Sequence, residues 1–152
     1  MIRMTRLADY GILLLTLFAR DRDRSMRSAR ELAAQSRLPL PTVSKILKTL
    51  AHNGLLETHR GARGGFLLAK APEQVSVAEV VAALEGPIGI TECTVHPGVC
   101  GVERLCPVRT NWKRINHAVL EALKGISLAE MARPLSFDPV PVTLRRSAGS
   151  GG

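Results

Sequence analysis

The sequence predicts a mainly α-helical chain that carries one small β-hairpin. Apolar residues recur at helical spacing in several segments, and capping-box motifs at Ser28 and Ser76 mark two helix starts. A glycine-rich turn, residues 60–65, lies between two short apolar runs of strand character. A chain of 152 residues has room for one compact domain and one or two further elements, and its core needs no disulfide.

The first two helices are predicted on either side of a charged turn. Residues 6–20 are strongly apolar at helical spacing, which favours a buried helix, and the run is too short to span a bilayer. Residues 20–27 are rich in charge and predict the turn. Ser28 and Glu31 have the capping-box spacing, so a short helix should run from residue 29 to about residue 35.

The third helix, residues 41–52, has the clearest pattern. Pro41 suits the first helical position, and Gly54 supplies a stop. At 100° per residue, Lys45 and Lys48 point away from the apolar side of this helix. That apolar side is a single stripe formed by Val43, Ile46, Leu47 and Leu50.

A hairpin is predicted next. Residues 55–59 and 66–70 are the strand candidates, and Arg60 and Arg63 charge the turn between them. The order of helix, short helix, turn, amphipathic helix and hairpin is that of a winged helix-turn-helix DNA-binding domain.

The positive charge is concentrated in the N-terminal half of the chain. Residues 1–70 contain 13 Lys and Arg against 5 Asp and Glu, so they carry all of the net charge of +8. Residues 71–152 contain 8 of each kind and are neutral overall. Such asymmetry favours a polyanionic partner. Because only 3% of the residues are aromatic, a stacking platform for RNA is absent and double-stranded DNA is favoured.

The candidate DNA contacts lie on the third helix and at the hairpin tip. The first turn of a recognition helix reaches base edges in the major groove, and an arginine-bearing wing suits the minor groove or the backbone beside it. Taken singly, the lysines fit an ordinary solvated face and the arginines fit a charged turn; the charge asymmetry favours DNA binding. The candidates are Thr42, Ser44 and Lys45 for bases, Lys48 for a phosphate, and Arg60 and Arg63 for the wing.

The C-terminal half predicts a short helix from Ser76 to about residue 84 and a longer helix from about residue 107. The longer helix has a narrow apolar stripe, typical of a helix–helix seam, and is the predicted dimerisation helix. One further turn or two is expected within residues 126–131. The seam residues are Trp112, Ile115, Val119 and Leu123.

The sequence predicts four regions along the chain. They are residues 1–84 for DNA binding, 85–106 for a cysteine loop, 107–132 for dimerisation and 133–152 for a disordered tail.

Three cysteines, Cys93, Cys100 and Cys106, are the only ones in the sequence and fall in one irregular segment. The spacing C-x6-C-x5-C lacks the close C-x2-4-C pairs of structural zinc sites and favours an iron–sulfur cluster. Zinc, a redox thiol switch and inert cysteines stay open as alternatives. The odd cysteine count and the absence of a secretory segment predict a cytoplasmic protein. A thiol-dependent enzyme is disfavoured, because His96 and His117 are the nearby histidines and no catalytic motif surrounds them.

The chain resembles the iron–sulfur-dependent winged-helix transcription regulators typified by IscR and NsrR. The likeness covers about residues 1–132 and is closest to the branch that regulates the SUF cluster-assembly operon. It lies in the opening Met4-Thr-Arg-Leu-Ala-Asp-Tyr-Gly, the third helix, the wing pattern Arg60-Gly61…Gly64-Gly65-Phe66 and the three cysteines.

The resemblance implies a homodimer that represses cluster-assembly genes and senses cluster status through a [2Fe–2S] or [4Fe–4S] cluster on the three cysteines. A nitric-oxide or redox sensor of the same fold is the first alternative, and a zinc-stabilised DNA-binding or scaffold protein is the second. The expected partners are an operator DNA and a second copy of the chain, without a membrane or a small-molecule substrate, and no enzymatic activity is expected.

The fourth cluster ligand is not settled by the resemblance. IscR-type members have a histidine three residues after the last cysteine, where this chain has Arg109. NsrR-type members use an aspartate of the first helix, and Asp9 matches that position, which implies a ligand from the partner subunit. A charge near a helix start is the ordinary alternative for Asp9. His96, inside the loop, is a further candidate.

Overall fold

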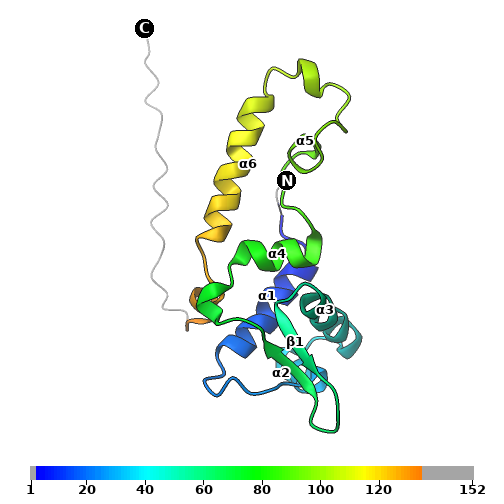
Figure 1. Cartoon of the computed structure of the whole chain (residues 1–152), viewed down its shortest axis with the longest axis vertical. Coiled ribbons are helices and arrows are strands. Elements are labelled where there is room, and N and C mark those ends of the chain that lie inside the picture. The colour runs from blue at the N-terminus through cyan, green and yellow to red at the C-terminus, as the bar shows by residue number, and fades with distance from the viewer. Residues whose placement is uncertain (1–2, 135–152) are drawn as a thin grey trace.

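The computed structural model describes residues 3–134 and shows a helical body with a β-hairpin at one end and a long arm at the other (Figure 1). The fold class is therefore the predicted one, mainly α with a two-stranded antiparallel sheet. The elements in chain order are α1 (Arg6–Ala19), α2 (Ala29–Ser36), α3 (Leu40–His52), β1 (Leu56–His59), β2 (Gly65–Leu68), the 3-10 helix η1 (Pro72–Gln74), α4 (Val77–Glu85), α5 (Glu92–Val95), the 3-10 helix η2 (Glu103–Leu105), α6 (Arg109–Lys124) and α7 (Leu128–Ala132).

Helix α1 lies at the centre of the body, in contact with α2, α3, α4 and α7. Thr5 caps its start by accepting a hydrogen bond from the Ala8 N–H, and the Thr5 hydroxyl donates to Glu85 at the end of α4. Leu14 and Leu15 are fully buried in the main core. The predicted buried first helix is confirmed.

The helix-turn-helix follows the sequence prediction closely. The capping box of Ser28 and Glu31 starts α2, and Arg37 ends it in the left-handed conformation (φ 59°). Helix α3 begins at Leu40, one residue earlier than predicted, so Pro41 occupies the second helical position instead of the first. All four residues of the predicted apolar stripe of α3 are fully buried, namely Val43, Ile46, Leu47 and Leu50.

The wing is the hairpin of β1 and β2, in which Leu56 faces Leu68 and His59 faces Gly65. An isolated bridge between Arg27 and Phe66 adds a short third segment beside β2. A Cβ atom on Gly65 would lie 2.8 Å from the Arg27 carbonyl oxygen, so a side chain at this position would push the two segments apart.

Helix α7 returns the chain to the body after α6. A capping box of Ser127 and Glu130 starts it, and Leu128 is 1% exposed within the main core. The Arg20 side chain donates from Nε to the Ala132 carbonyl at 3.0 Å. A part of the predicted dimerisation region thus packs on the DNA-binding body. The division into four regions stays a prediction, and residues 135–152 of the predicted tail lie outside the described residues.

Residues 91–124, which comprise α5, the cysteine segment and α6, form a projection that we call the cysteine arm (Figure 1). The sequence predicted an irregular loop here, but the segment contains α5 and η2, because single helical turns are too short to give a periodic pattern. Asn116 of α6 fastens the preceding linker, since its side chain accepts from Ile90 N–H at 3.0 Å and donates to the Ile88 carbonyl at 3.5 Å. Among the described residues, no helix is long and apolar enough to cross a membrane.

Candidate DNA interface and cysteine arm

The outer face of α3 presents the predicted DNA contacts. Lys45 and Lys48 are exposed, whereas Thr42 and Ser44 are half-buried. A groove between α3 and β1 is lined by Lys48 and His52, among other residues. The burial of the opposite stripe fixes the orientation of α3, so both lysines face solvent on the side of the helix that a DNA groove could receive.

Arg60 and Arg63 are exposed at the tip of the wing, as predicted. The neighbouring turn between α1 and α2 is held by an internal network: Arg27 lies 3.7 Å from the Asp21 carboxylate and donates to Gln35. The hydroxyl of Ser25 donates to Asp21 and lowers the pKa of that carboxyl below its usual value. Arg27 therefore stabilises this turn through contacts within the chain, unlike the exposed arginines of the wing tip.

The three cysteines are free and differ in exposure. Cys93 is 8% exposed in α5, and Cys100 and Cys106 are half-buried. The Thr91 hydroxyl lies 3.3 Å from the Cys93 sulfur. Nowhere in residues 3–134 do three or more His, Cys, Asp or Glu side chains come together in a group able to hold a metal ion. A single protomer therefore holds the thiols on one arm without closing them into a site.

The candidates for a fourth ligand are not joined to the cysteines in this chain. Asp9 is exposed in the first turn of α1, and His96 is exposed at the end of α5. Arg109 stands where the resemblance places a histidine in other members, and its Nη2 pairs with Glu103 Oε1 at 2.6 Å. Arg109 Nε is buried and has no hydrogen-bond acceptor, the one such side-chain atom in the described part of the chain. The guanidinium is paired with Glu103, and its buried Nε–H can donate to one further acceptor.

Glu103 is the residue that sequence reasoning missed. It is 6% exposed, although the three-residue spacing of Cys100, Glu103 and Cys106 gave no apolar pattern to suggest burial. An S-x-x-E motif marks a helix start from sequence, but nothing comparable marks a carboxylate that folds inward. Its partners, Gly98 before Cys100 and Arg109 after Cys106, are known only from the tertiary structure.

The predicted seam on α6 is largely uncovered. Trp112 and Ile115 are 37% and 44% exposed, and the helix has no buried residue. Val119 and Leu123 are half-buried, and Leu123 packs against the small cluster of Ala8, Val77 and Val81 at the base of the arm. An uncovered apolar face on a 16-residue helix calls for a partner surface.

The basic outer face of α3 beside a charged wing defines a winged helix-turn-helix DNA-binding transcription regulator. Residues 4–134 match the Rrf2 family, described as "Iron-dependent Transcriptional regulator", and the chain belongs to that family. Its members are transcription regulators and not enzymes, as the sequence predicted.

Two relatives illustrate the sequence similarity. The chain is 32% identical to the transcriptional regulator NsrR of Shouchella clausii over 131 residues, which cover 86% of this chain and 88% of the relative. It is 29% identical to IscR of Erwinia tasmaniensis over 101 residues, which cover 66% of this chain and 61% of the relative. The predicted resemblance to this family is confirmed.

Solved structures share the fold. CymR, the global cysteine regulator of B. subtilis, superposes with a TM-score of 0.69 at 25% identity, over 87% of this chain and 97% of that one. IscR of T. potens superposes with a TM-score of 0.64 at 23% identity, over 86% of this chain and 85% of that one. The winged-helix architecture predicted from the sequence is that of these regulators.

Proposed function

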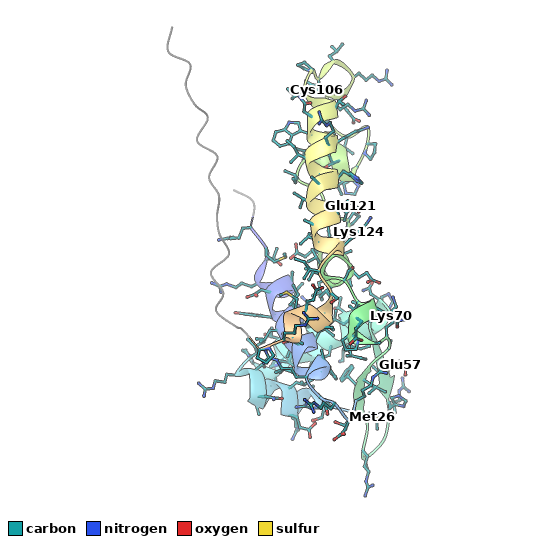
Figure 2. The ribbon with its side chains drawn as sticks, turned by 90° about the vertical axis from the view of Figure 1, so that its left-hand side faces the viewer. Met26, Glu57, Lys70, Cys106, Glu121 and Lys124 are labelled. Carbon is teal, nitrogen blue, oxygen red and sulfur yellow. The ribbon has the colours of Figure 1, made fainter. Side chains whose placement is uncertain are left out.

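We propose that this regulator is a homodimer whose affinity for operator DNA depends on an iron–sulfur cluster held by Cys93, Cys100 and Cys106. The observation that carries the proposal is the placement of every cysteine of the sequence, free of disulfides, on one arm. In Figure 2, Cys106 lies at the end of the molecule opposite to Glu57 of the wing, so the sensing and DNA-binding parts are separate.

The donor chemistry of the arm fits a cluster. Thiolates are the common ligands of iron–sulfur clusters, and hydrogen-bond donors beside the sulfurs tune the reduction potential. Arg109, three residues after Cys106, has a buried Nε donor without an acceptor. When bound, the cluster would supply a redox- and iron-responsive group, and the residues of the arm would hold and orient it.

The proposal includes a ligand from a second protomer. Because one chain does not gather a complete donor set, we propose that a group from outside the chain joins the three cysteines. Asp9, exposed near the start of α1, is the residue that we propose for this role. Four protein ligands hold [2Fe–2S] and [4Fe–4S] clusters alike, so both types fit the proposed donor set, and the absorption spectrum of the purified protein distinguishes them.

A dimer is supported by the uncovered face of α6. Trp112 and Ile115 are large apolar side chains that are exposed on one face of α6. A second copy of α6 would cover them, as in a helix–helix seam. Two copies would also place two α3 helices for two half-sites of one operator.

The regulatory effect is one of linkage. If cluster-bound and cluster-free forms differ in DNA affinity, cluster occupancy changes promoter occupancy, and a typical coupling of about 1–3 kcal/mol changes affinity roughly 5- to 150-fold. We propose that the protein acts in the cytoplasm, where it binds DNA and represses cluster-assembly genes of the SUF type. The relatives named IscR and NsrR support a cluster sensor without separating this role from nitric-oxide sensing.

Anaerobic purification of the full chain tests the proposal. We expect a coloured protein with stoichiometric iron and sulfide, and DNA affinity that changes when the cluster is removed. Cys106→Ser should lose the iron, and His96→Ala should keep it if Asp9 and not His96 completes the ligand set. A colourless protein with one zinc per chain would contradict the cluster and favour the zinc-stabilised alternative. Asp9→Ala tests the ligand from the second protomer and should weaken cluster binding. Cluster loss that is faster with nitric oxide than with iron depletion would favour the nitric-oxide sensor.

A further inference from the structure

The middle of the cysteine segment has an inverted pattern of burial. Its apolar side chains are outside: Val99, Val102 and Leu105 are 64%, 65% and 89% exposed. Its carboxylate is inside, because Glu103 is 6% exposed and is the one buried charged side chain among residues 3–134. A buried carboxylate is costly unless it is paired and hydrogen-bonded, so its partners show what it does.

The Glu103 carboxylate joins the two sides of the stretch from Cys100 to Cys106. Oε2 accepts a hydrogen bond from the Gly98 N–H at 2.5 Å, two residues before Cys100. Oε1 pairs with Arg109 Nη2 at 2.6 Å, three residues after Cys106. One side chain thus ties the backbone between Cys93 and Cys100 to the first turn of α6.

The backbone of Glu103 bonds to both cysteines. Its N–H donates to the Cys100 carbonyl at 3.0 Å, and its own carbonyl accepts from the Cys106 N–H at 3.4 Å. The Arg109 N–H donates in turn to the Cys106 carbonyl at 3.4 Å. Successive three-residue turns therefore fix the positions of Cys100 and Cys106 relative to the same buried residue.

We propose that Glu103 and Arg109 are the positioning pair of the cysteine arm, which holds Cys100 and Cys106 at a set separation before any metal binds. This inference rests on the proposed function for its biological meaning, since a preformed pair of thiols lowers the ordering cost of taking up a cluster. Cys93 stands outside the pair, because it is buried separately in α5 beside Thr91.

The reactivity of the thiols in the metal-free, reduced full chain tests the pair without any cluster. Iodoacetamide is the probe, and labelling of each cysteine is followed by mass spectrometry. In Glu103→Gln and Arg109→Gln we expect labelling of Cys100 and Cys106 to rise roughly tenfold, because the segment opens locally, with little change at Cys93. Arg109→Lys keeps the positive charge, so Cys100 and Cys106 should retain most of their protection from labelling in this variant. The matched controls are Glu92→Gln and Arg104→Gln, which alter exposed residues of the same arm.

Each outcome decides the question. Unchanged labelling of Cys100 and Cys106 in Glu103→Gln would overturn the proposal, and so would an equal rise at all three cysteines, which would mean a general loss of structure. Anaerobic reconstitution with iron and sulfide is the second measurement, read from the visible absorption spectrum. A wild-type chain that takes up no cluster while the variants still expose Cys100 and Cys106 would refute the proposed function and leave the pair standing. A cluster with the wild-type spectrum in variants whose thiols are also unchanged would refute the pair alone.

Discussion

Removal of Lys45 and Lys48 tests the outer face of α3 as the DNA-binding surface. Both lysines are exposed, and neither forms a salt bridge within residues 3–134, so alanine at these positions leaves the stripe that holds α3 to the core intact. The change therefore acts on the charge presented to DNA and not on the stability of the fold. We expect weaker binding to any DNA sequence when Lys48 is removed.

The magnitude follows from the number of phosphate contacts. Each contact contributes about 0.9 to the slope of log affinity against log salt concentration. In a dimer, Lys48→Ala removes two contacts and should reduce the slope by about 2, and the double variant with Lys45→Ala should reduce it by up to roughly twice that amount. A base contact by Lys45 would add a loss of discrimination of about 1–3 kcal/mol at one operator position.

The assay is fluorescence anisotropy with an operator duplex over a range of salt concentrations. Lys124→Ala is the matched control, because it removes the same charge from the C-terminal end of α6, where Lys124 pairs with Glu121 at 3.0 Å (Figure 2). Its salt slope should equal that of the wild type. An unchanged slope in the double variant, or an equal loss in the control, would refute the assignment of α3 as the recognition helix.

Three further predictions follow from packing and charge. Leu128→Ala should lower the free energy of unfolding by about 2–5 kcal/mol, because Leu128 is 1% exposed in the main core. Chemical denaturation measures this free energy, and a loss under about 1 kcal/mol would mean that α7 adds little to the stability of the body. Trp112→Glu should convert the proposed dimer to monomers in light scattering, because burial of a carboxylate at this 37%-exposed position of the proposed seam is costly. Lys113→Glu, at an exposed position of the same helix, should leave the dimer intact. Hydrogen bonds from the N–H groups of Ser28, Ser76 and Ser127 lower the pKa of Glu31, Glu79 and Glu130 below the usual 4.5, so the stability they add is present above that value and is lost as the pH falls through the lowered pKa. Thermal unfolding between about pH 7 and about pH 3 measures this loss, which should be smaller in Glu79→Gln because the amide does not titrate.

Most of the DNA-binding body could be predicted from the sequence because its signals are local. The periodic stripe of α3 and the capping boxes at Ser28 and Ser76 act within one or two helical turns. The start of α7 has the same motif in Ser127 and Glu130, so that helix was open to prediction by the same rule. The packing of α7 beside α1 could not be predicted by such a rule, because it joins residues that are more than a hundred positions apart, such as Arg20 and Ala132.

The sequence by itself determined that three cysteines share one segment and that the positive charge lies in the half that carries α3. These are properties of composition and spacing, and folding does not change them. Only the tertiary structure decided the role of Arg109 and Glu103, which pair inside the cysteine arm. The physical reason is that burial of a charge is decided by its partners, and the Gly98 N–H and the guanidinium of Arg109 reach Glu103 only when the chain turns back on itself.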